Sequence, residues 1–155
     1  MGFGTLSVKG RALRYLAQRE HSRAELEFKL ARAVQDSPEA SAQDQIASAL
    51  DDLAAKGLLS DSRAAEAVLN GQGQRYGSRR LKQSLQSKGL DPALVVATLQ
   101  RARGTEFERA LGVWRRRFGK PPADMAERAR QMRFLAGRGF DGDVIRRVLQ
   151  APDDD

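Results

Sequence analysis

The stretch RRLKQSLQSKGLDPALVVATLQ, residues 79–100, decides how this chain folds. It aligns without a gap on ARQMRFLAGRGFDGDVIRRVLQ, residues 129–150, fifty residues further along. In both stretches, spaced apolar residues flank a basic residue, a glycine, an apolar residue and an aspartate. Internal repetition of this kind is typical of helical repeat proteins, in which similar units pack on their neighbours. The sequence therefore favours several similar helical units over one compact enzyme core.

A weaker third copy lies near the amino end of the chain. Its apolar positions pair with those of residues 79–100 as follows: Leu26 with Leu81, Leu30 with Leu85, Ile46 with Val95, Ala49 with Thr98 and Leu50 with Leu99. The separation from Leu26 to Ile46 is 20 residues, whereas that from Leu81 to Val95 is 14. This copy therefore carries six extra residues, which we place in a polar loop at 36–41.

Nine helices are predicted from the spacing of the apolar residues. Apolar side chains recur every three or four positions, and strand-like alternation is almost absent. Trp114 and Phe118 share one apolar stripe with Phe107 and Leu111, so we expect them in the core rather than on a base-stacking platform. The predicted helices cover residues 7–19, 22–34, 43–56, 61–75, 78–88, 91–102, 105–118, 124–137 and 141–150.

Grouped in threes, these helices predict an all-α fold of tandem three-helix units that form an elongated, curved modular array. The predicted units cover residues 7–57, with the extra loop at 35–43, then 60–103 and 105–150. An acidic tail follows at 151–155. Because each short helix is marginal alone, packing within a unit must stabilise it.

The predicted helix starts carry capping residues. A capping box pairs a serine or threonine hydroxyl with a carboxylate three residues later, so that each satisfies a free backbone amide. Asp91 before Pro92 predicts another start, since proline at the first helical position loses no hydrogen bond. The sequence contains two capping boxes and one aspartate variant: Ser22 with Glu25, Thr105 with Glu108, and Asp124 with Glu127.

The predicted helix stops are glycines. Gly57, Gly89 and Gly139 each follow a lysine or arginine at the end of a predicted helix. A glycine there adopts the left-handed conformation at low cost, and the cation lies near the negative end of the helix dipole. We therefore expect all three glycines to have positive φ angles.

The charge of the chain is uneven. Residues 1–60 hold 8 Lys and Arg against 8 Asp and Glu, whereas residues 61–150 hold 19 against 9, a net charge of +10. The three aspartates of the tail reduce the total to +7. A basic region of this size indicates an anionic partner, such as nucleic acid or an acidic protein groove.

The basic residues gather near the ends of predicted helices, and most are arginines. The planar guanidinium presents a fork of donors that matches phosphates and carboxylates. A single arginine is typical of a solvated helix face, but the grouping over several helices indicates a continuous basic surface. The candidates for contacts with a partner or with DNA are Arg75, Arg79, Arg80, Lys82, Arg115, Arg116, Arg117, Lys120, Arg130 and Arg133.

Catalytic chemistry finds no support in the sequence. His21 is the one histidine, and the adjacent Ser22 serves a helix cap. There is no cysteine, and no carboxylate cluster has metal-ligand spacing. The G-x-G-x-x-G string at 137–142 follows a predicted helix, whereas a dinucleotide site needs a strand there. We expect no catalytic residue, no cofactor and no bound metal.

Location is constrained by what the sequence lacks. No apolar run approaches the roughly 18–20 residues that a transmembrane helix needs, and residues 1–5 lead into no apolar signal segment. The lack of cysteine fits a reducing compartment. We expect a cytoplasmic protein with no membrane partner, and a monomer.

Two motifs carry a resemblance to a known family. The segments are REHSRAEL at 19–26 and GLLSD at 57–61 followed by GSRRLKQSLQSKGL at 77–90. Together they resemble the RecX family of bacterial recombination regulators, and the resemblance covers roughly residues 7–150. One departure is Ala64, where the family usually has an aromatic residue.

The resemblance implies a fold of tandem three-helix units and a non-catalytic role. Proteins of that family bind the RecA recombinase filament on single-stranded DNA, in the groove of the filament. They inhibit its ATPase, strand-exchange and co-protease activities, and so modulate homologous recombination, DNA repair and the SOS response. On this interpretation, Arg79, Arg80 and residues 115–117 lie on the face that meets the filament.

Two other interpretations stay open. A basic three-helix unit could bind DNA directly but weakly, through phosphates and without sequence preference, and some members of that family also bind DNA directly. The chain could also be an adaptor of another helical-repeat class. A tetratricopeptide array is disfavoured, because its period is about 34 residues with two helices.

Overall fold

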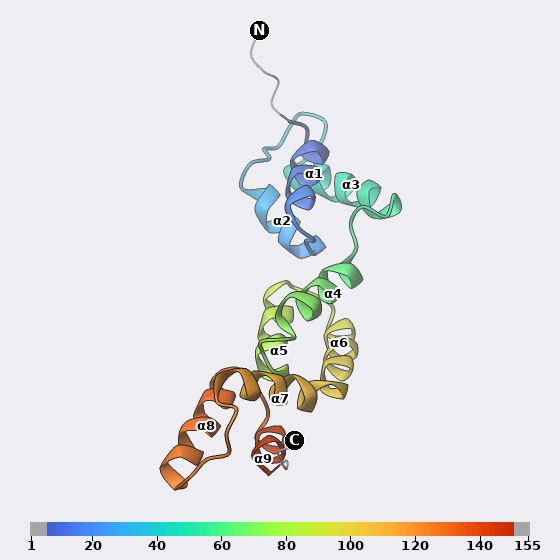
Figure 1. Cartoon of the computed structure of the whole chain (residues 1–155). Coiled ribbons are helices and arrows are strands. Elements are labelled where there is room, and N and C mark those ends of the chain that lie inside the picture. Colours follow the sequence, from blue (N-terminus) through green and yellow to red (C-terminus); the bar gives the residue numbers. More distant parts are fainter. Residues whose placement is uncertain (1–5, 151–155) are drawn as a thin grey trace. The chain divides into compact units, whose positions relative to one another are not determined.

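The computed structural model describes residues 6–150, and within that range the chain forms nine α-helices and no strands (Figure 1). The expected all-α helical repeat is confirmed. The helices are α1 (Val8–Gln18), α2 (Arg23–Ala31), α3 (Ala42–Ala55), α4 (Asp61–Gln72), α5 (Ser78–Ser87), α6 (Pro92–Gly104), α7 (Glu106–Arg117), α8 (Met125–Gly137) and α9 (Gly142–Gln150).

The described residues divide into two compact units. The first comprises residues up to Ala67 together with Lys88–Leu90, and the second comprises Val68–Ser87 and the residues from Asp91 onward. The division into three units at 7–57, 60–103 and 105–150 stays a prediction. The predicted acidic tail at 151–155 lies outside the described residues.

The core of the first unit joins α1, α2 and α3. Ala12 is fully buried on α1, where a small side chain lets the other two helices approach closely. Of the apolar residues that defined the first copy, all but Ala49 lie in this core, and Ala49 is buried as well. The buried members of the core are Ala12, Leu26, Leu30, Ile46, Leu50, Leu53 and Leu59.

In the second unit, α7, α8 and α9 enclose an apolar cluster. Trp114 is 5% exposed, and its indole Nε1 donates to Oε1 of the buried Gln131 at 2.8 Å. Phe118 is half-buried against the same cluster. The core placement expected for this stripe is therefore confirmed. The buried members are Ala110, Val113, Trp114, Leu135, Phe140, Ile145 and Val148.

A left-handed glycine turn packs against the first turn of a helix in each unit. In the first unit, Gly89 has φ +64°, and Ser22 Oγ donates to the carbonyl of Lys88 at 2.5 Å. A Cβ added to Gly89 would lie 2.7 Å from the Cβ of Ala24. Only a residue without a side chain therefore allows this approach.

The second unit repeats the arrangement at the start of α5. Gly139 has φ +90°, and the amide of Gly77 donates to the carbonyl of Arg138 at 2.9 Å. The amide of Arg79 donates to the carbonyl of Gly139 at 3.1 Å. A Cβ on Gly139 would lie 2.6 Å from the Cβ of Arg80. Gly57 also has a positive φ, so all three predicted glycine stops are confirmed.

Most of the expected caps form. The Ser22 and Glu25 capping box is complete, with hydrogen bonds of 3.1 and 3.0 Å. Asp91 accepts from the amide of Ala93, and Asp124 accepts from that of Glu127, both at 2.8 Å.

The capping box predicted at Thr105 is wrong. Helix α6 continues through Gly104, so Thr105 is also its C-cap, and the Thr105 hydroxyl donates back to the carbonyl of Ala102 at 3.3 Å. Thr105 makes no side-chain cap to α7. Glu108 is exposed, and the buried carboxylate is that of Glu106.

His21 is buried in the connection between α1 and α2. Its Nδ1 lies 3.0 Å from the carbonyl oxygen of Arg19, and its Nε2 lies 2.9 Å from Nζ of Lys29. A neutral ring with its proton on Nδ1 satisfies both contacts, because Nε2 then accepts from the ammonium. Burial lowers the pKa of His21, and the charges of Arg19 and Lys29 lower it further, although the backbone hydrogen bond opposes them.

Glu25 beside it is held in the ionised state. Burial alone would raise the pKa of its carboxyl. Hydrogen bonds from Arg19 and from the amide of Ser22, with the charge of Lys88, more than offset that effect and lower the pKa to about 2. Both groups therefore make the first unit more stable at neutral pH than in acid.

The close approach at Gly89 predicts a difference between two alanine substitutions. Gly57→Ala introduces a side chain at positive φ with nothing within 4 Å, so we expect a loss of about 1 kcal/mol in the free energy of unfolding. Gly89→Ala adds the collision with Ala24, for a loss of about 2–4 kcal/mol. Urea denaturation measures both, and Ala24→Gly should restore part of the Gly89→Ala loss. Equal losses for the two variants would contradict the proposed packing.

The burial of His21 predicts how stability depends on pH. Below the ordinary histidine pKa of about 6.5 the unfolded chain takes up a proton that the folded chain rejects, so stability falls with falling pH. His21→Gln should flatten the slope of unfolding free energy between about pH 6.5 and 5.5, because the chain has one histidine. The further loss below about pH 4.5, where Glu25 titrates in the unfolded chain, should remain. An unchanged slope in the variant would show that His21 is not the responsible group.

Candidate functional site

All ten basic residues expected to contact a partner have exposed side chains. The structure brings five of them, from the loop before α5 and from helices α5, α7 and α8 of the second unit, against a common set of aromatic rings or into a shared recess. These are Arg75, Arg80, Arg116, Arg117 and Arg130. In the described contacts, the other five candidates neither lie over one of these rings nor line the recess. They are Arg79, Lys82, Arg115, Lys120 and Arg133.

Tyr76, between α4 and α5, is the first of these rings. The Cζ atom of Arg80 lies 4.2 Å from the ring centroid. Arg75 and Arg138 approach the same ring at 5.6 Å each. Three cations from the loop, from α5 and from the end of α8 therefore meet at one aromatic side chain.

Phe134 and Phe118 extend this arrangement along α7 and α8. Arg117 and Arg138 each lie 5.2 Å from the ring centroid of Phe134. The two phenylalanine rings meet edge to face at 5.4 Å, and Arg130 lies 5.6 Å from the ring of Phe118. We call the whole set the arginine–aromatic surface, comprising Arg75, Tyr76, Arg80, Arg116, Arg117, Phe118, Arg130, Phe134 and Arg138.

A recess of about 250 Å³ opens within this surface. Four guanidinium groups surround it, from Arg75, Arg116, Arg117 and Arg138, and Val113 and Phe134 supply apolar walls. A guanidinium whose face rests on a ring still presents its N–H donors in its own plane. The recess can therefore bind phosphate or carboxylate oxygens at several points at once.

Two charged residues of α7 hold the loop that carries Arg75 and Tyr76. The guanidinium of Arg109 donates to the carbonyls of Gly73, Tyr76 and Ala102 at 2.5, 2.6 and 2.7 Å. Burial lowers the pKa of Arg109, although Glu106 opposes the shift, and an arginine stays charged there.

Glu106 fixes the other end of the same loop. It is 2% exposed, and its Oε1 accepts from the amide of Ser78 at 2.9 Å. The carboxylate therefore lies at the positive end of the α5 dipole and satisfies an otherwise free amide. Glu106 and Arg109 position the arginine–aromatic surface without belonging to it.

The sequence contained partial signals for the residues that the prediction left out. Two of those residues, Phe134 and Arg138, follow the predicted Arg130 at successive four-residue spacings, so the three lie on one face of α8 and its C-cap. Nothing in the sequence links that face with Tyr76, which lies some sixty residues earlier. Only the packing of α8 and the loop in the second unit brings them together.

The charge of the chain is concentrated in the unit that carries this surface. Within the described residues, the first unit holds 10 Lys and Arg against 10 Asp and Glu. The second holds 17 against 7, a net charge of +10. The positive charge of the second unit therefore attracts anionic molecules more strongly than the neutral first unit does.

Between residues 6 and 150, no helix is long and apolar enough to cross a membrane. Over that range, no three His, Cys, Asp or Glu side chains come together in a way that could hold a metal ion.

Two family models match this chain. The model of the second three-helix domain of RecX matches residues 60–99, and that of the third three-helix domain of RecX matches residues 105–149. The fold is similar to the crystal structure of RecX from Lactobacillus salivarius, with a TM-score of 0.75, 21% identity and 92% of each chain covered. A second crystal structure, of a regulatory protein RecX, gives a TM-score of 0.70 over 93% of this chain and 72% of the other.

Relatives of higher identity cover nearly the whole chain. The regulatory protein RecX of Leptothrix cholodnii is 51% identical over 148 residues, which are 96% of this chain and 90% of the relative. That of Ralstonia nicotianae is 49% identical over 151 residues, which are 96% and 89% of the two chains. The chain therefore belongs to the RecX family of regulatory proteins.

Proposed function

We propose that this protein binds the RecA recombinase filament in its groove and inhibits the filament's ATPase, strand-exchange and co-protease activities. In this role it modulates homologous recombination and DNA repair. Membership of a family of regulatory proteins supports the proposal. The arginine–aromatic surface is the observation that carries it, because it offers a built site for an anionic partner.

The chemistry of a recombinase filament matches this surface. Such a filament exposes the phosphates of its single-stranded DNA and acidic protein side chains along one groove. The net charge of +10 on the second unit speeds encounter with such a groove and orients the protein as it arrives. The four guanidiniums of the recess then form charge-assisted hydrogen bonds that fix its position.

The proposed inhibition is by occupancy. A bound protein that bridges filament subunits restrains the changes in subunit packing on which ATP hydrolysis and strand exchange depend. The family is regulatory rather than enzymatic, and we propose that the chain itself catalyses no reaction. We place this action in the cytoplasm, with the protein acting as a monomer.

Direct binding to single-stranded DNA is the second candidate function. Aromatic rings among arginines are typical of proteins that stack bases and track a phosphate backbone. Here, however, guanidiniums lie over Tyr76 and Phe134, and Phe118 and Phe134 contact each other. These contacts leave less ring face for bases than a stacking platform needs, and favour binding through phosphates or carboxylates.

A paired substitution tests the role of the arginine–aromatic surface. Arg80→Gln with Arg117→Gln removes two charges from it and keeps hydrogen-bonding side chains of similar length. We expect the concentration for half-inhibition of recombinase ATPase on single-stranded DNA to rise by about tenfold or more. The matched control is Arg14→Gln with Arg63→Gln, which removes two exposed charges from the neutral unit. Equal inhibition by the two folded double variants would remove the surface from the interface.

A DNA-binding assay without recombinase separates the two candidate functions. Direct phosphate binding weakens steeply with salt and shows little sequence preference. We expect naked single-stranded DNA to bind only weakly at about 150 mM salt, while inhibition of the recombinase persists. Tight DNA binding under these conditions, with inhibition that follows DNA occupancy alone, would favour the second candidate.

A further inference from the structure

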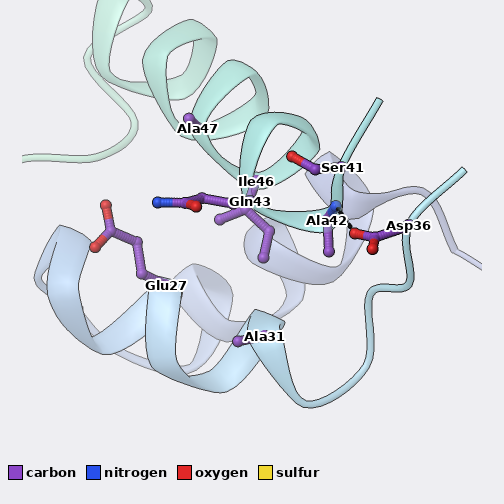
Figure 2. Close-up of a pocket in the computed structure, with 8 residues that line it drawn as sticks. All are labelled: Glu27, Ala31, Asp36, Ser41, Ala42, Gln43, Ile46 and Ala47. Carbon is purple, nitrogen blue, oxygen red and sulfur yellow. Dashed lines mark hydrogen bonds between the residues drawn. The ribbon is translucent and has the colours of Figure 1, made fainter. Parts of the chain in front are cut away.

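A groove of about 580 Å³ separates α2 from α3, wholly within the first unit (Figure 2). Helix α2 contributes Glu27 and Ala31, and α3 contributes Ala42, the polar Gln43, Ile46 and Ala47. The connecting loop adds Asp36. None of these residues belongs to the arginine–aromatic surface, so the groove is a second, separate feature of the chain.

The groove lies beside the six extra residues of the first copy. Ten residues, 32–41, connect α2 to α3, whereas four connect α5 to α6 and four connect α8 to α9. The two short connections contain Gly89 and Gly139, and each packs against the start of a helix. The long connection instead supplies Asp36 and Ser41 to the wall of the groove.

Hydrogen bonds hold this loop in place. The carboxylate of Asp36 accepts from the amide of Ala42 at 2.6 Å. The side chain of Gln45 donates to the carbonyls of Gln35 and Ala40 at 3.0 and 3.1 Å. The wall is therefore anchored to α3 rather than folded over the groove, and the groove is preformed.

The groove has an apolar floor with space above it. Ile46 forms part of the floor, and the alanines at 31, 42 and 47 extend no further than Cβ. On the same helix as Glu27 and Ala31, the ring of Phe28 is 68% exposed, and its described contact is the guanidinium of Arg32 at 5.4 Å. A large exposed aromatic on a helix that lines a groove is typical of a protein-binding surface.

The charge at the rim identifies the kind of partner. Glu27, which also pairs with Arg23 at 3.1 Å, and Asp36 place carboxylates on both sides of the groove, as Figure 2 shows. Carboxylates repel DNA phosphates, so this groove suits a protein rather than nucleic acid. They attract a lysine or arginine, and the floor accepts an apolar side chain next to it.

We propose that this groove and Phe28 bind a segment of the recombinase that presents an apolar side chain beside a lysine or arginine. The inference rests on the proposed function and adds a second contact of opposite charge. The arginine–aromatic surface meets the anionic part of the filament, and the groove binds protein. An apolar anchor in a preformed groove with a charged rim is the usual arrangement of helix and peptide recognition.

Two substitutions in the groove test this inference, each with a matched control. Ala31→Trp fills the groove from the end of α2, and Ala55→Trp places the same side chain at an exposed position of α3 outside it. Glu27→Lys inverts one charge of the rim, and Glu39→Lys makes the same change in the loop that connects α2 to α3, at a residue that does not line the groove. We expect each groove variant to bind preassembled recombinase–DNA filaments about tenfold more weakly, and each control to bind within about twofold of the original chain.

Fluorescence anisotropy of the labelled protein measures these affinities. Groove variants that bind as tightly as their controls would overturn the inference, while the proposed function would stand. If the original chain itself neither binds the filament nor inhibits its ATPase, the proposed function fails first. The two failures are therefore distinguishable.

A photo-crosslinking amino acid in place of Phe28 identifies the occupant directly. Crosslinking to recombinase in assembled filaments supports the inference. Crosslinking to DNA, crosslinking to a second copy of this chain, or no crosslink to recombinase despite measured filament binding would each overturn it.

Discussion

Close contact between a glycine turn and the first turn of a helix is the constraint on which both units depend. A helix start leaves backbone amides without partners, and a carbonyl that arrives from a neighbouring turn can satisfy them. Such a carbonyl reaches the amides only if no side chain stands in the way, which is the case at Gly139. The left-handed φ of this residue also ends α8, so one glycine both stops a helix and packs a unit.

The turn at Gly139 also positions the side chain of Arg138, one of the cations of the arginine–aromatic surface. Arg138 donates no backbone bond to the start of α5, but its carbonyl accepts one from Gly77. Its side chain meanwhile lies over Tyr76 and Phe134. The residue that closes the packing therefore also joins the two halves of the arginine–aromatic surface. Fold and candidate site share one short segment here, which explains how a small unit can hold several guanidiniums in fixed positions.

Helix α7 uses charged residues in two different environments. Glu106 and Arg109 lie inward at its beginning, where their partners are backbone groups of the loop and of α5 and α6. Arg116 and Arg117 lie at its exposed end, near the negative end of the helix dipole. The inward pair was not predictable from the sequence, because a charged residue on a helix usually faces water. Its role depends on carbonyls that only the folded chain brings together.

The repeats, in contrast, could be predicted from the sequence, because each copy needs the same residue types at the same turns and buried positions. Gly89 and Gly139 occupy equivalent positions because both turns need a positive φ angle. Leu26 and Leu81 occupy equivalent positions because each helix buries the same face. The capping box predicted at Thr105 was wrong because helix α6 continues up to Gly104, directly before this residue. The four-residue sequence pattern of a capping box does not reveal where the preceding helix ends. The sequence predicted which region of the chain is basic but not which arginines lie together. Those arginines are the ones that contact aromatic rings, and the rings come from separate elements that only the fold brings together.

The composition of that cluster has a consequence for regulation. Every cation of the arginine–aromatic surface is an arginine, and the two lysines among the basic candidates stand outside it. Acetyltransferases that neutralise lysine therefore have no target on this surface, and no pH found in a living cell removes its charge. Under the proposed function, the ability of this surface to bind therefore does not vary with pH or with lysine acetylation, and the extent of binding follows the amount of protein present.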